Sequence, residues 1–568
     1  MPHMSQRLRD DTESPAHPPE PDLASTAPDT PQPAASDCIP APGMPGRRRG
    51  DTPGSINRHR TGLACVWLGL LLAVLGFSFQ GTRGLWNTDE GRYVDNALQM
   101  VDSGNYLIPA YNAEQANYTK PPLALWAIAA SIRVFGPNTF AARVPSALSF
   151  MLTALMLCAM GRVLMPGKAW LPGLVYACSL APFIAANVVS TDDMLTLCEA
   201  LAMWGFILAA FTPQERSQRI GVHVMWLGFG LAFLAKGPPG LLPLAAAAVF
   251  IVRRDGAAAL RRYAPWTGVV LFGVVGLAWY AAVIARDPPL LDYFLRYELF
   301  DRIFTAAQQR NPQWYGWLVV YGPVLVLGAL PWWPLLLAPL RSAMAPARWR
   351  HAWRQPGPTL FLALWFLLPL AVFCIARSRL PVYALPLFLP LALLTGLALH
   401  DRIDLTSRRQ WLMLGAWIAL LLTIKGAVGT YMHPRQDDRF MARQLSTMAA
   451  GADFSAVAFV ESTGSSVATS EHTPWGMRLY LHKPLYAIAW KRPAAATTLC
   501  RLAERHPALL VVVDRGIGKD RLLSDTATCM PHRHVDIGKW HASDVLLFDR
   551  QATSPRPAAS ANRPGQPG

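Results

Sequence analysis

The chain has 568 residues, of which 52% are hydrophobic and only 15% are charged. Soluble domains usually carry about a quarter of charged residues, so this composition excludes a set of soluble modules and indicates an integral membrane protein. The formal net charge of +16 does not indicate nucleic-acid binding, because Lys and Arg are denser in alternate loops between the apolar runs, which is typical of membrane topology.

The N-terminal segment 1–60 is rich in Pro, Ala, Ser, Asp and Thr and has few large apolar side chains. Such a segment cannot bury enough surface to fold, so we expect a disordered tail. The uncharged run 62–79 follows a basic cluster. It is too long for the apolar core of a signal peptide and no small-residue cleavage site follows it, so we interpret it as a retained membrane anchor.

Ten further apolar runs can cross a bilayer, some with help from tilt. They lie at 144–161, 169–190, 194–212, 220–235, 237–252, 264–285, 316–340, 356–376, 380–399 and 410–424. The run 121–135 is shorter, starts with two prolines and contains Arg133, so we interpret it as an interfacial helix. The predicted fold for residues 61–430 is an all-α polytopic membrane bundle with about 11 spans plus interfacial helices.

The loops between these runs indicate the orientation of the chain. With eleven spans and a cytoplasmic N-terminus, the inner loops contain 15 Lys or Arg in 47 residues, whereas the outer segments contain 12 in 99. Counting 121–135 as a span would reverse every later loop and remove this bias. The positive-inside rule therefore predicts that the C-terminal region lies outside the cytoplasm.

Residues 431–552 have a different pattern from the bundle. The segments "FSAVAFVES", "MRLYLHKPLYAIAW", "ALLVVVDR" and "DVLLFDR" are typical of strands and 497–506 is typical of a helix, which predicts a small C-terminal α/β periplasmic domain. Residues 553–568 form a second disordered tail. In an oxidising periplasm Cys500 and Cys529 either form a disulfide or remain unpaired.

The sequence shows no Cys/His spacing of the kind that holds a metal. Because such spacings are the usual signature of a structural metal site, we assign no metal ligand and predict no cofactor, and the sequence leaves a bound divalent metal open.

Charged and aromatic residues gather in the segments assigned to the outer face. Between the first and second spans these are Asp89, Glu90, Arg92, Tyr93, Tyr118, Lys120 and Arg143. Later segments supply Asp192, Asp193, Glu199, Lys236, Arg296, Glu298, Asp301, Arg302, Arg377 and Arg379.

Each of these residues has a structural alternative. Asp89 and Glu90 suit the first turn of an amphipathic surface helix, because acids stabilise a helix N-terminus, and Tyr93 would lie on its apolar face. A Lys or Arg at the end of a span often reaches for the headgroups without binding a ligand. Glu199 suits a paired residue inside the bundle.

The combination of these residues favours a ligand site. Cations beside apolar edges, interleaved with acids, suit a phosphate held at headgroup depth through charge-assisted hydrogen bonds. Carboxylates among them suit proton transfer or recognition of a hydroxylated or cationic group. The predicted ligand is an anionic lipid with a polar head.

The order and wording of six segments resemble the bacterial aminoarabinose transferases and the wider protein O-mannosyltransferase-like group. The segments are "TDEGRYVDNALQMVDSGNYLIP", "YTKPPLALW", "FGPNTFAARVPS", "STDDMLT", "FLAKGPPGLLP" and "RSRLPVYALPLFLPLALL". The resemblance covers about residues 63 to 430. It implies the GT-C fold, with an active site on the outer face, and a sugar donor linked to a polyprenyl phosphate instead of a nucleotide.

The resemblance also implies roles for individual residues. Asp89 matches the catalytic acid of the family, with Glu90 beside it. The family's basic positions around the donor phosphate match Arg92, Lys120, Lys236 and Arg379, and its other site positions match Arg143, Asp192, Glu298 and Arg302. From the charges and aromatics of this sequence we add Arg377 to the phosphate-binding residues, and Tyr93, Tyr118 and Glu199 to the substrate-binding residues.

Three positions depart from the family pattern. Asp193 stands where aminoarabinose transferases usually have Pro, Gly91 stands where they commonly have Thr, and Arg377 and Arg379 replace the usual lysines. Arginine keeps the charge but adds bidentate geometry. These departures leave the identity of the sugar open.

The leading expectation is a glycosyltransferase of the bacterial inner membrane. It would move an amino sugar from undecaprenyl phosphate to lipid A phosphate on the periplasmic side, with inversion. A second hypothesis keeps the fold and donor but has a protein, glycan or cell-wall hydroxyl as acceptor. A secondary transporter is a third, which the sequence disfavours because transporters place their charges near the bilayer midplane, often in two related halves.

Overall fold

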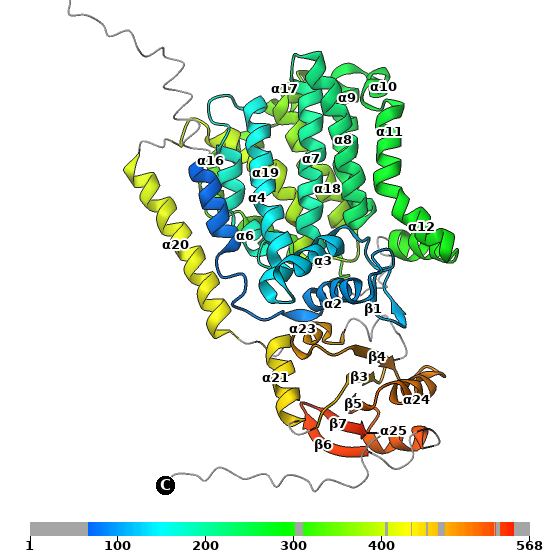
Figure 1. Cartoon of the computed structure of the whole chain (residues 1–568). Helices are drawn as coiled ribbons and strands as arrows, with labels where there is room; N and C mark the ends of the chain where they lie inside the picture. The colour runs from blue at the N-terminus through cyan, green and yellow to red at the C-terminus, as the bar shows by residue number, and fades with distance from the viewer. Residues whose placement is uncertain are drawn as a thin grey trace, which may run out of the picture. The chain divides into compact units, whose positions relative to one another are not determined.

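The computed structural model describes residues 66–301, 310–403, 407–432, 434, 436–449, 452–463, 472–527, 529 and 534–549 (Figure 1). The two tails expected at 1–60 and 553–568 lie outside these residues. The described part is mostly helical and contains a five-stranded sheet in its C-terminal region.

Seven helices within the described residues are long and apolar enough to cross a membrane. They are α4 (Thr139–Leu164), α7 (Thr191–Phe211), α8 (Glu215–Lys236), the run Trp266–Arg286 formed by α11, η3 and α12, α18 (Pro358–Ile375), the run Pro381–Leu399 formed by η5 and α19, and α20 (Arg408–Tyr431). The expected polytopic helical membrane bundle is confirmed.

The other four expected spans are shorter or interrupted helices. The run 62–79 contains a helix over Val66–Phe77. The run 169–190 is divided into α5 (Leu171–Cys178) and α6 (Leu180–Ala185), 237–252 into η1 (Pro238–Leu241) and α9 (Leu242–Asp255), and 316–340 into α15 (Gly316–Gly328) and α16 (Trp333–Ala343). Proline lies in or beside each of these three breaks, because it cannot donate the helical hydrogen bond.

Two of the breaks satisfy each other's backbone. At the first break Ser179 has an extended conformation, and the next N–H, that of Leu180, donates to the carbonyl of Leu330 at the α15–α16 break, 3.1 Å away. A broken helix is tolerated at membrane depth when another protein group satisfies its freed backbone. The interrupted helices therefore remain compatible with a membrane-embedded bundle.

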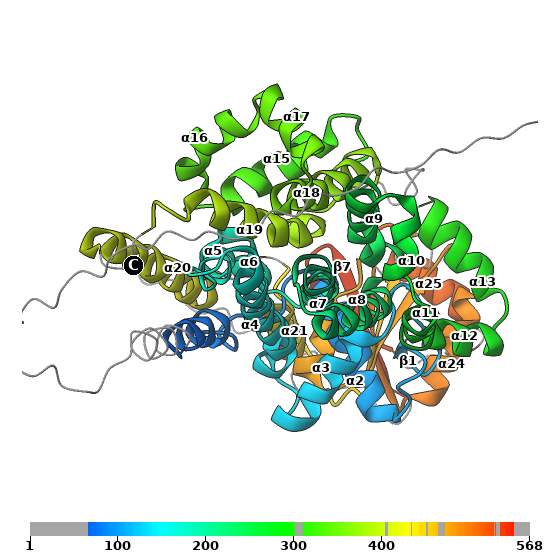
Figure 2. The same ribbon diagram turned by 90° about the horizontal axis from the view of Figure 1, so that it is seen from above.

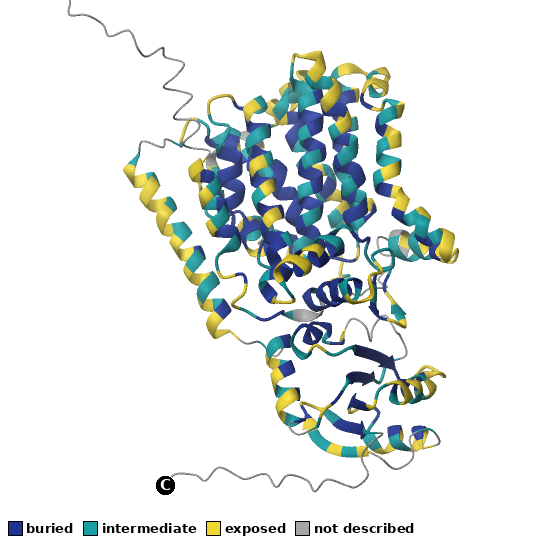
Figure 3. Cartoon of the chain, in the orientation of Figure 1, coloured by how far each residue is buried: buried dark blue, intermediate teal, exposed yellow. Residues whose placement is uncertain are grey.

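The faces of the helices show which side meets lipid. In α4 the side chains of Leu148, Leu152 and Leu155 are exposed, whereas Phe150 and Leu157 are fully buried. The exposed leucines follow the spacing of one helix face, and their apolar exposure suits a hydrocarbon environment. Helix α20 is exposed along most of its length (Figure 3).

Helices α7 and α8 lie side by side near the middle of the bundle (Figure 2). Their close approach depends on small residues: a methyl group added at Gly228 would lie 2.3 Å from the backbone nitrogen of Ala202. Because lipid tails are as apolar as the side chains, the hydrophobic effect does not drive helices together within a membrane. Such helices associate largely through close packing of this kind. This pair holds the α7 N-terminus and the α8 C-terminus at fixed positions.

Helix α3 (Leu123–Phe135) has 13 residues, which corresponds to about 20 Å and is less than the roughly 30 Å of a hydrocarbon core. It packs against α2 (Asn87–Ser103) and α4. Its length agrees with the prediction that 121–135 does not span.

The C-terminal region is built on a mixed sheet in the order β4-β3-β5-β7-β6. Strand β3 (Ala456–Glu461) pairs in parallel with β4 (Leu485–Ala489) and β5 (Ala508–Val513), whereas β7 (Ser543–Asp549) is antiparallel to β5 and to β6 (His534–Trp540). Both faces of the sheet are covered, with alternate residues of β3 buried in two separate cores.

Several helices complete the C-terminal domain. Helices α24 (Ala495–Arg505) and α25 (Lys519–Thr526) contribute to one core, and α21 (Asp438–Met448) to the other. The expected strand "MRLYLHKPLYAIAW" is wrong in its first half, where η6 (Trp475–Met477) and α23 (Arg478–Leu481) precede β4. Strand β6 and helices α21 and α25 were not expected.

Strand β4 is an edge of the sheet, and a small hairpin from the loop after α2 covers it. The hairpin consists of β1 (Ala110–Asn112) and β2 (Gln115–Ala116). The Asn112 side-chain amide donates to the Leu485 carbonyl at 3.0 Å, and that of Gln115 donates to the Ala487 carbonyl at 2.7 Å. Side chains thus occupy backbone acceptors that an edge strand would otherwise expose.

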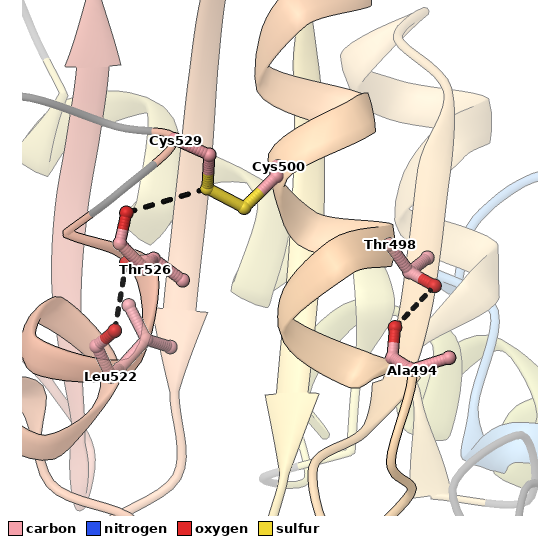
Figure 4. The surroundings of a disulfide bond; sticks show 6 residues. All are labelled: Ala494, Thr498, Cys500, Leu522, Thr526 and Cys529. Carbon is pink, nitrogen blue, oxygen red and sulfur yellow. Dashed lines mark hydrogen bonds between the residues drawn. A yellow bond between two sulfur atoms is a disulfide. The ribbon is translucent and has the colours of Figure 1, made fainter.

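A disulfide joins Cys500 in α24 to Cys529 just after α25 (Figure 4). The hydroxyls of Thr498 and Thr526 beside it donate to carbonyls one helical turn earlier, so both flanking segments keep a regular hydrogen-bond pattern. The bond closes a loop of 29 residues and ties together the two helices on one face of the sheet.

We predict that the variant Cys500→Ser/Cys529→Ser lowers the stability of the C-terminal domain by about 2–4 kcal/mol, because the unfolded chain loses a constraint. Thermal unfolding of purified protein with and without a reductant measures this. The reductant should lower the unfolding temperature of the wild type and of the control Cys374→Ser, but not that of the double variant. If the reductant leaves the unfolding temperature of the wild type unchanged, the two thiols are unpaired.

Candidate functional site

The acidic pair lies in the first turn of α2, which runs from Asn87 to Ser103 and ends at Gly104 in the left-handed conformation. Before the helix, Trp86 forms a single antiparallel bridge with Asp437. The pair thus lies where a helix N-terminus favours acidic side chains, and the same turn borders a polar cavity.

Glu90 points into the protein and is 2% exposed. Arg83 donates to both of its carboxylate oxygens, at 2.7 and 2.9 Å, and Arg143 approaches at 3.3 Å. The backbone N–H groups of Trp86 and Val189 donate to it at 2.7 and 2.9 Å. The carboxylate thus connects α2 to α4, through Arg143, and to the turn before α7, through Val189.

Burial disfavours the charged form of Glu90, but Arg143, Arg83 and the hydrogen bonds outweigh it and lower the pKa of Glu90 to about 2. A carboxylate with so low a pKa is a poor proton acceptor. Arg143 is committed to the same network, since it also donates to the carbonyls of Gln80, Arg83 and Gly84. The geometry therefore favours a structural role for both residues.

Asp89 faces a cavity of about 250 Å³. The cavity brings together eight of the residues singled out from the sequence, namely Asp89, Glu90, Arg92, Tyr93, Lys120, Asp192, Lys236 and Glu298. Its other lining residues are Trp86, Thr119, Val188, Val189, Ser190, Tyr297, Arg310, Leu380, Pro381, Val382 and Tyr383. They come from α2, the loop after β2, α7, α8, η4 (Tyr293–Asp301) and the segments before α15 and at η5.

The Asp89 side chain is 37% exposed and pairs with Arg92 one turn later. Burial raises the pKa of Asp89, but Arg92, Arg310 and Lys120 outweigh this effect, so its pKa lies below the ordinary value of 3.8. The carboxylate is consequently ionised at neutral pH and is open to the cavity.

The cations near Asp89 come from separate parts of the chain. Lys120 lies just before α3 and donates to the Thr119 carbonyl at 2.9 Å. Arg310 precedes α15, and its guanidinium lies 3.5 Å from the Tyr383 hydroxyl. Together with Arg92 they give this part of the cavity a positive field, which suits a phosphate.

A second group of charges lies between α7 and α8. Asp192, in the first turn of α7, forms an ion pair with Lys236 at the end of α8. Lys236 also lies over the ring of Tyr383, 4.1 Å from its centroid.

Several expected site residues lie away from the cavity lining. Arg377 is exposed, and Glu199 is buried within α7. Tyr118 packs among apolar residues beside Trp126 and Tyr280, and Arg302 lies outside the described residues. Arg379 is 3% exposed and donates to the carbonyls of Asn311, Gln313 and Cys374, so it shapes the loop that carries Arg310.

Sequence reasoning missed some of the cavity residues. Tyr383 belongs to the quoted segment "RSRLPVYALPLFLPLALL", from which only the arginines were selected. Arg310 follows a stretch without a recognised motif, and its one signal was a positive charge shortly before an apolar run. Trp86 and Ser190 flank the acidic residues of α2 and α7 and were not singled out from the sequence.

Within the described residues there is no group of three or more His, Cys, Asp or Glu side chains that could hold a metal ion.

The bundle with its charged cavity beside a short amphipathic helix defines a multi-pass membrane protein of the GT-C fold class. The chain can be superimposed on the crystal structure of ArnT from Cupriavidus metallidurans bound to undecaprenyl phosphate with a TM-score of 0.66 at 20% identity, covering 87% of this chain and 100% of that chain. At this identity the similarity shows the fold.

Sequence comparison gives the more particular result. Residues 119–280 match the family described as dolichyl-phosphate-mannose-protein mannosyltransferase. The undecaprenyl phosphate-α-4-amino-4-deoxy-L-arabinose arabinosyl transferase 2 of Pseudomonas fluorescens is 32% identical over 378 residues, 64% of this chain and 60% of that protein. The corresponding transferase of an Enterobacter species is 31% identical over 370 residues, 63% and 62% of the two chains.

The chain is thus similar in sequence to aminoarabinose transferases and shares the fold of ArnT. The matched region covers about 60% of the length of these curated relatives. The activities given in their names are those of the relatives themselves.

We predict that Glu90→Gln destabilises the protein by about 3–5 kcal/mol, because removing one partner leaves Arg83 and Arg143 as uncompensated buried charges. Thermal unfolding in detergent measures the effect. The matched control is Glu215→Gln, which removes an exposed partner of Arg219 and should cost less than about 1 kcal/mol. If Glu90→Gln unfolds at the wild-type temperature but has lost its activity, Glu90 belongs instead to the chemistry.

Proposed function

We propose that this protein is a glycosyltransferase that moves a sugar, with inversion, from undecaprenyl phosphate to a phosphate of lipid A. The observation that carries the proposal is the cavity in which an ionised, partly exposed carboxylate, Asp89, lies beside cations from three separate segments. Such a combination suits a lipid-linked phosphate leaving group and an acceptor that attacks next to an acid.

The cations have a role in breaking the donor bond. In the reaction the bond between the anomeric carbon and the donor phosphate oxygen breaks, and its electron pair leaves on the phosphate. Lys120, Arg310 and Arg92 are held around the cavity before the reaction, so they can stabilise this developing charge without rearranging. The Tyr383 hydroxyl beside Arg310 can donate a further hydrogen bond.

Asp89 has a role on the acceptor side. The acceptor oxygen forms the new bond to the anomeric carbon from the face opposite the leaving phosphate, which inverts the configuration. A hydroxyl acceptor would give its proton to the Asp89 carboxylate. A phosphate acceptor at neutral pH is already anionic, and Asp89 would then accept a remaining proton or orient the group through Arg92.

The Asp192–Lys236 pair is suited to recognising the sugar. A sugar that carries an amino group would bring a cation near Asp192, while Lys236 could contact a hydroxyl or the phosphate. Glu199 lies deeper in the same helix α7 and is 3% exposed, so this proposal gives it no contact with the sugar. This arrangement favours an amino sugar over a neutral one.

The location proposed for the site is the periplasmic side of the bacterial inner membrane, with the N-terminus in the cytoplasm. The distribution of Lys and Arg among the loops supports this orientation. The disulfide in the C-terminal domain supports it independently, because disulfides persist in oxidising compartments and are rare in the cytosol.

A second candidate function differs in its acceptor. The match of residues 119–280 to a protein mannosyltransferase family favours a hydroxyl acceptor on a protein, a glycan or the cell wall. Purified enzyme supplied with defined undecaprenyl-phosphate sugars and with either lipid A or a hydroxyl acceptor separates the two. Mass spectrometry of lipid A from a deletion strain is the complementary test: unchanged lipid A would remove the lipid A proposal and leave the hydroxyl-acceptor enzyme.

We predict that Asp89→Asn lowers the rate constant of transfer at least about 100-fold while the protein still folds, because the amide cannot accept a proton. The pKa of Asp89 is below 3.8, so its carboxylate form persists until the pH falls through that lowered value. Wild-type transfer should therefore show no loss caused by Asp89 above pH 3.8. Near-wild-type transfer by Asp89→Asn would remove the catalytic assignment.

We also predict that Lys120→Ala and Arg310→Ala each raise KM for the donor about 10- to 100-fold, the usual size of one lost charge-assisted hydrogen bond. The matched control is Arg377→Ala, whose exposed side chain lies outside the cavity lining and should leave KM unchanged. Equal effects of all three substitutions would point to a general charge effect at the membrane surface and would contradict the assignment.

A further inference from the structure

Helix α2 presents three differently engaged faces, because successive helical residues point about 100° apart. Asp89, Arg92 and Tyr93 face the cavity. Glu90 is anchored in the bundle by Arg83 and Arg143. The third face carries Gly91, Asp95, Gln99 and Asp102, at the spacing i, i+4, i+8 and i+11, and it contacts the C-terminal domain.

The closest contact on this third face is between two glycines. A methyl group added at Gly91 would lie 2.4 Å from the backbone nitrogen of Gly476. One added at Gly476 would first meet the Asp438 carboxylate and would lie 3.0 Å from the Gly91 Cα atom. Real side chains do not approach a backbone so closely, so any other residue would push α2 and η6 apart. The backbone of the C-terminal domain thus lies directly against the turn of α2 that carries Asp89.

Arg478 of α23 continues the contact along the same face. It donates to the side chains of Asp102 and Gln99 at 2.7 and 2.9 Å and to Asp95 at 3.3 Å. It also donates to the Tyr111 carbonyl at 3.0 Å. Arg478 and Asp95 are 7% and 0% exposed, so the pair is removed from water and holds its geometry tightly.

The segment before α2 is held by the same domain. The Leu85 N–H donates to the Tyr480 hydroxyl, and the Leu85 carbonyl accepts from the Asp438 N–H, both at 2.9 Å. Behind α2, the ring of Tyr111 stacks on Trp475 with centroids 4.2 Å apart. The C-terminal domain therefore fixes α2 before its first residue, along one face and beyond its last residue.

We propose that the C-terminal domain sets the position of Asp89 in the cavity, and that Gly91, Gly476 and Arg478 are the positioning residues that transmit this constraint to α2. The inference rests on the proposed glycosyl transfer and assigns the C-terminal domain a part in it. Gly91 takes no part in the chemistry. It serves by having no side chain, which lets the domain backbone define one side of the helix while Glu90 defines another.

The first test compares Gly91→Ala with the wild type. An added methyl should displace α2, and a misplacement of about 1 Å can cost as much as about 100-fold in rate, so we expect kcat to fall between about 10- and 100-fold. KM for the donor should change less than about twofold, since Lys120 and Arg310 lie on other segments. The matched control is Gly415→Ala in α20, where a methyl meets nothing within 4 Å.

The pH profile of kcat separates positioning from a loss of folded enzyme. Asp89 shares the cavity with the charges of Arg92, Lys120, Arg310, Lys236, Asp192 and Glu298. If α2 is displaced, Asp89 moves away from Lys120 and Arg310, so the pKa of Asp89 rises. The acidic limb of the kcat profile then shifts to higher pH. Partial unfolding lowers the whole profile without moving this limb.

The second test keeps the inference falsifiable if a glycine variant does not fold. Arg478→Gln removes the charge toward Asp95 and Asp102, whereas Arg478→Lys keeps it. We expect Arg478→Gln to lower kcat and shift the acidic limb, and Arg478→Lys to restore much of both. The inference is overturned if Gly91→Ala has the wild-type kcat and an unshifted acidic limb in its kcat profile. If Gly91→Ala does not fold, the same result in Arg478→Gln overturns it. Absence of transfer by the wild type would overturn the proposed function instead.

Discussion

The buried carboxylate of Glu90 is the interaction on which the arrangement of the site depends. It is surrounded by two guanidinium groups and two backbone N–H groups, which come from the approach to α2, from α4 and from the turn before α7. A charge in such a place is stable only when every partner is present. The requirement joins α2 to the bundle at a defined rotation, and this rotation turns the neighbouring Asp89 toward the cavity. Two adjacent acids thus have separate tasks because a helix points them in different directions.

The second determinant is the balance of charge inside the cavity. Lys236 and Asp192 form an ion pair, and Lys120, Arg310 and Arg92 lie in the same lining as Asp89 and Glu298. Arg92, Arg310 and Lys120 together lower the pKa of Asp89. In the proposed reaction these cations would meet the leaving phosphate, and the Asp192–Lys236 pair would meet the sugar.

The sequence predicted the bundle well because hydropathy directly reflects burial in lipid. It overestimated the number of uninterrupted spans, since a sliding comparison of apolar content does not register the extended residue at Ser179 or the prolines between α15 and α16. It predicted the acidic pair and Lys120, whose surroundings contain recognisable motifs. Arg379 and Arg143 hold backbone carbonyls, and a buried guanidinium in that position has the same one-letter signature as one that holds a ligand, so the sequence alone does not separate the two roles. The polar face of α2 at Asp95, Gln99 and Asp102 is typical of a solvent-exposed helix, and nothing local reveals that Arg478, far along the chain, covers it.

The small hairpin β1–β2 has a consequence for how this protein can be taken apart. It belongs to the polypeptide between the first spans, yet its Asn112 and Gln115 side chains occupy the outermost strand of the distant sheet. A fragment cut near residue 431 would keep all five strands but would uncover the carbonyls of Leu485 and Ala487, and with them a template for pairing with a second fragment. The point where the chain leaves the membrane is therefore a poor place to divide it, and soluble pieces of the tail would be prone to self-association unless the hairpin were supplied with them.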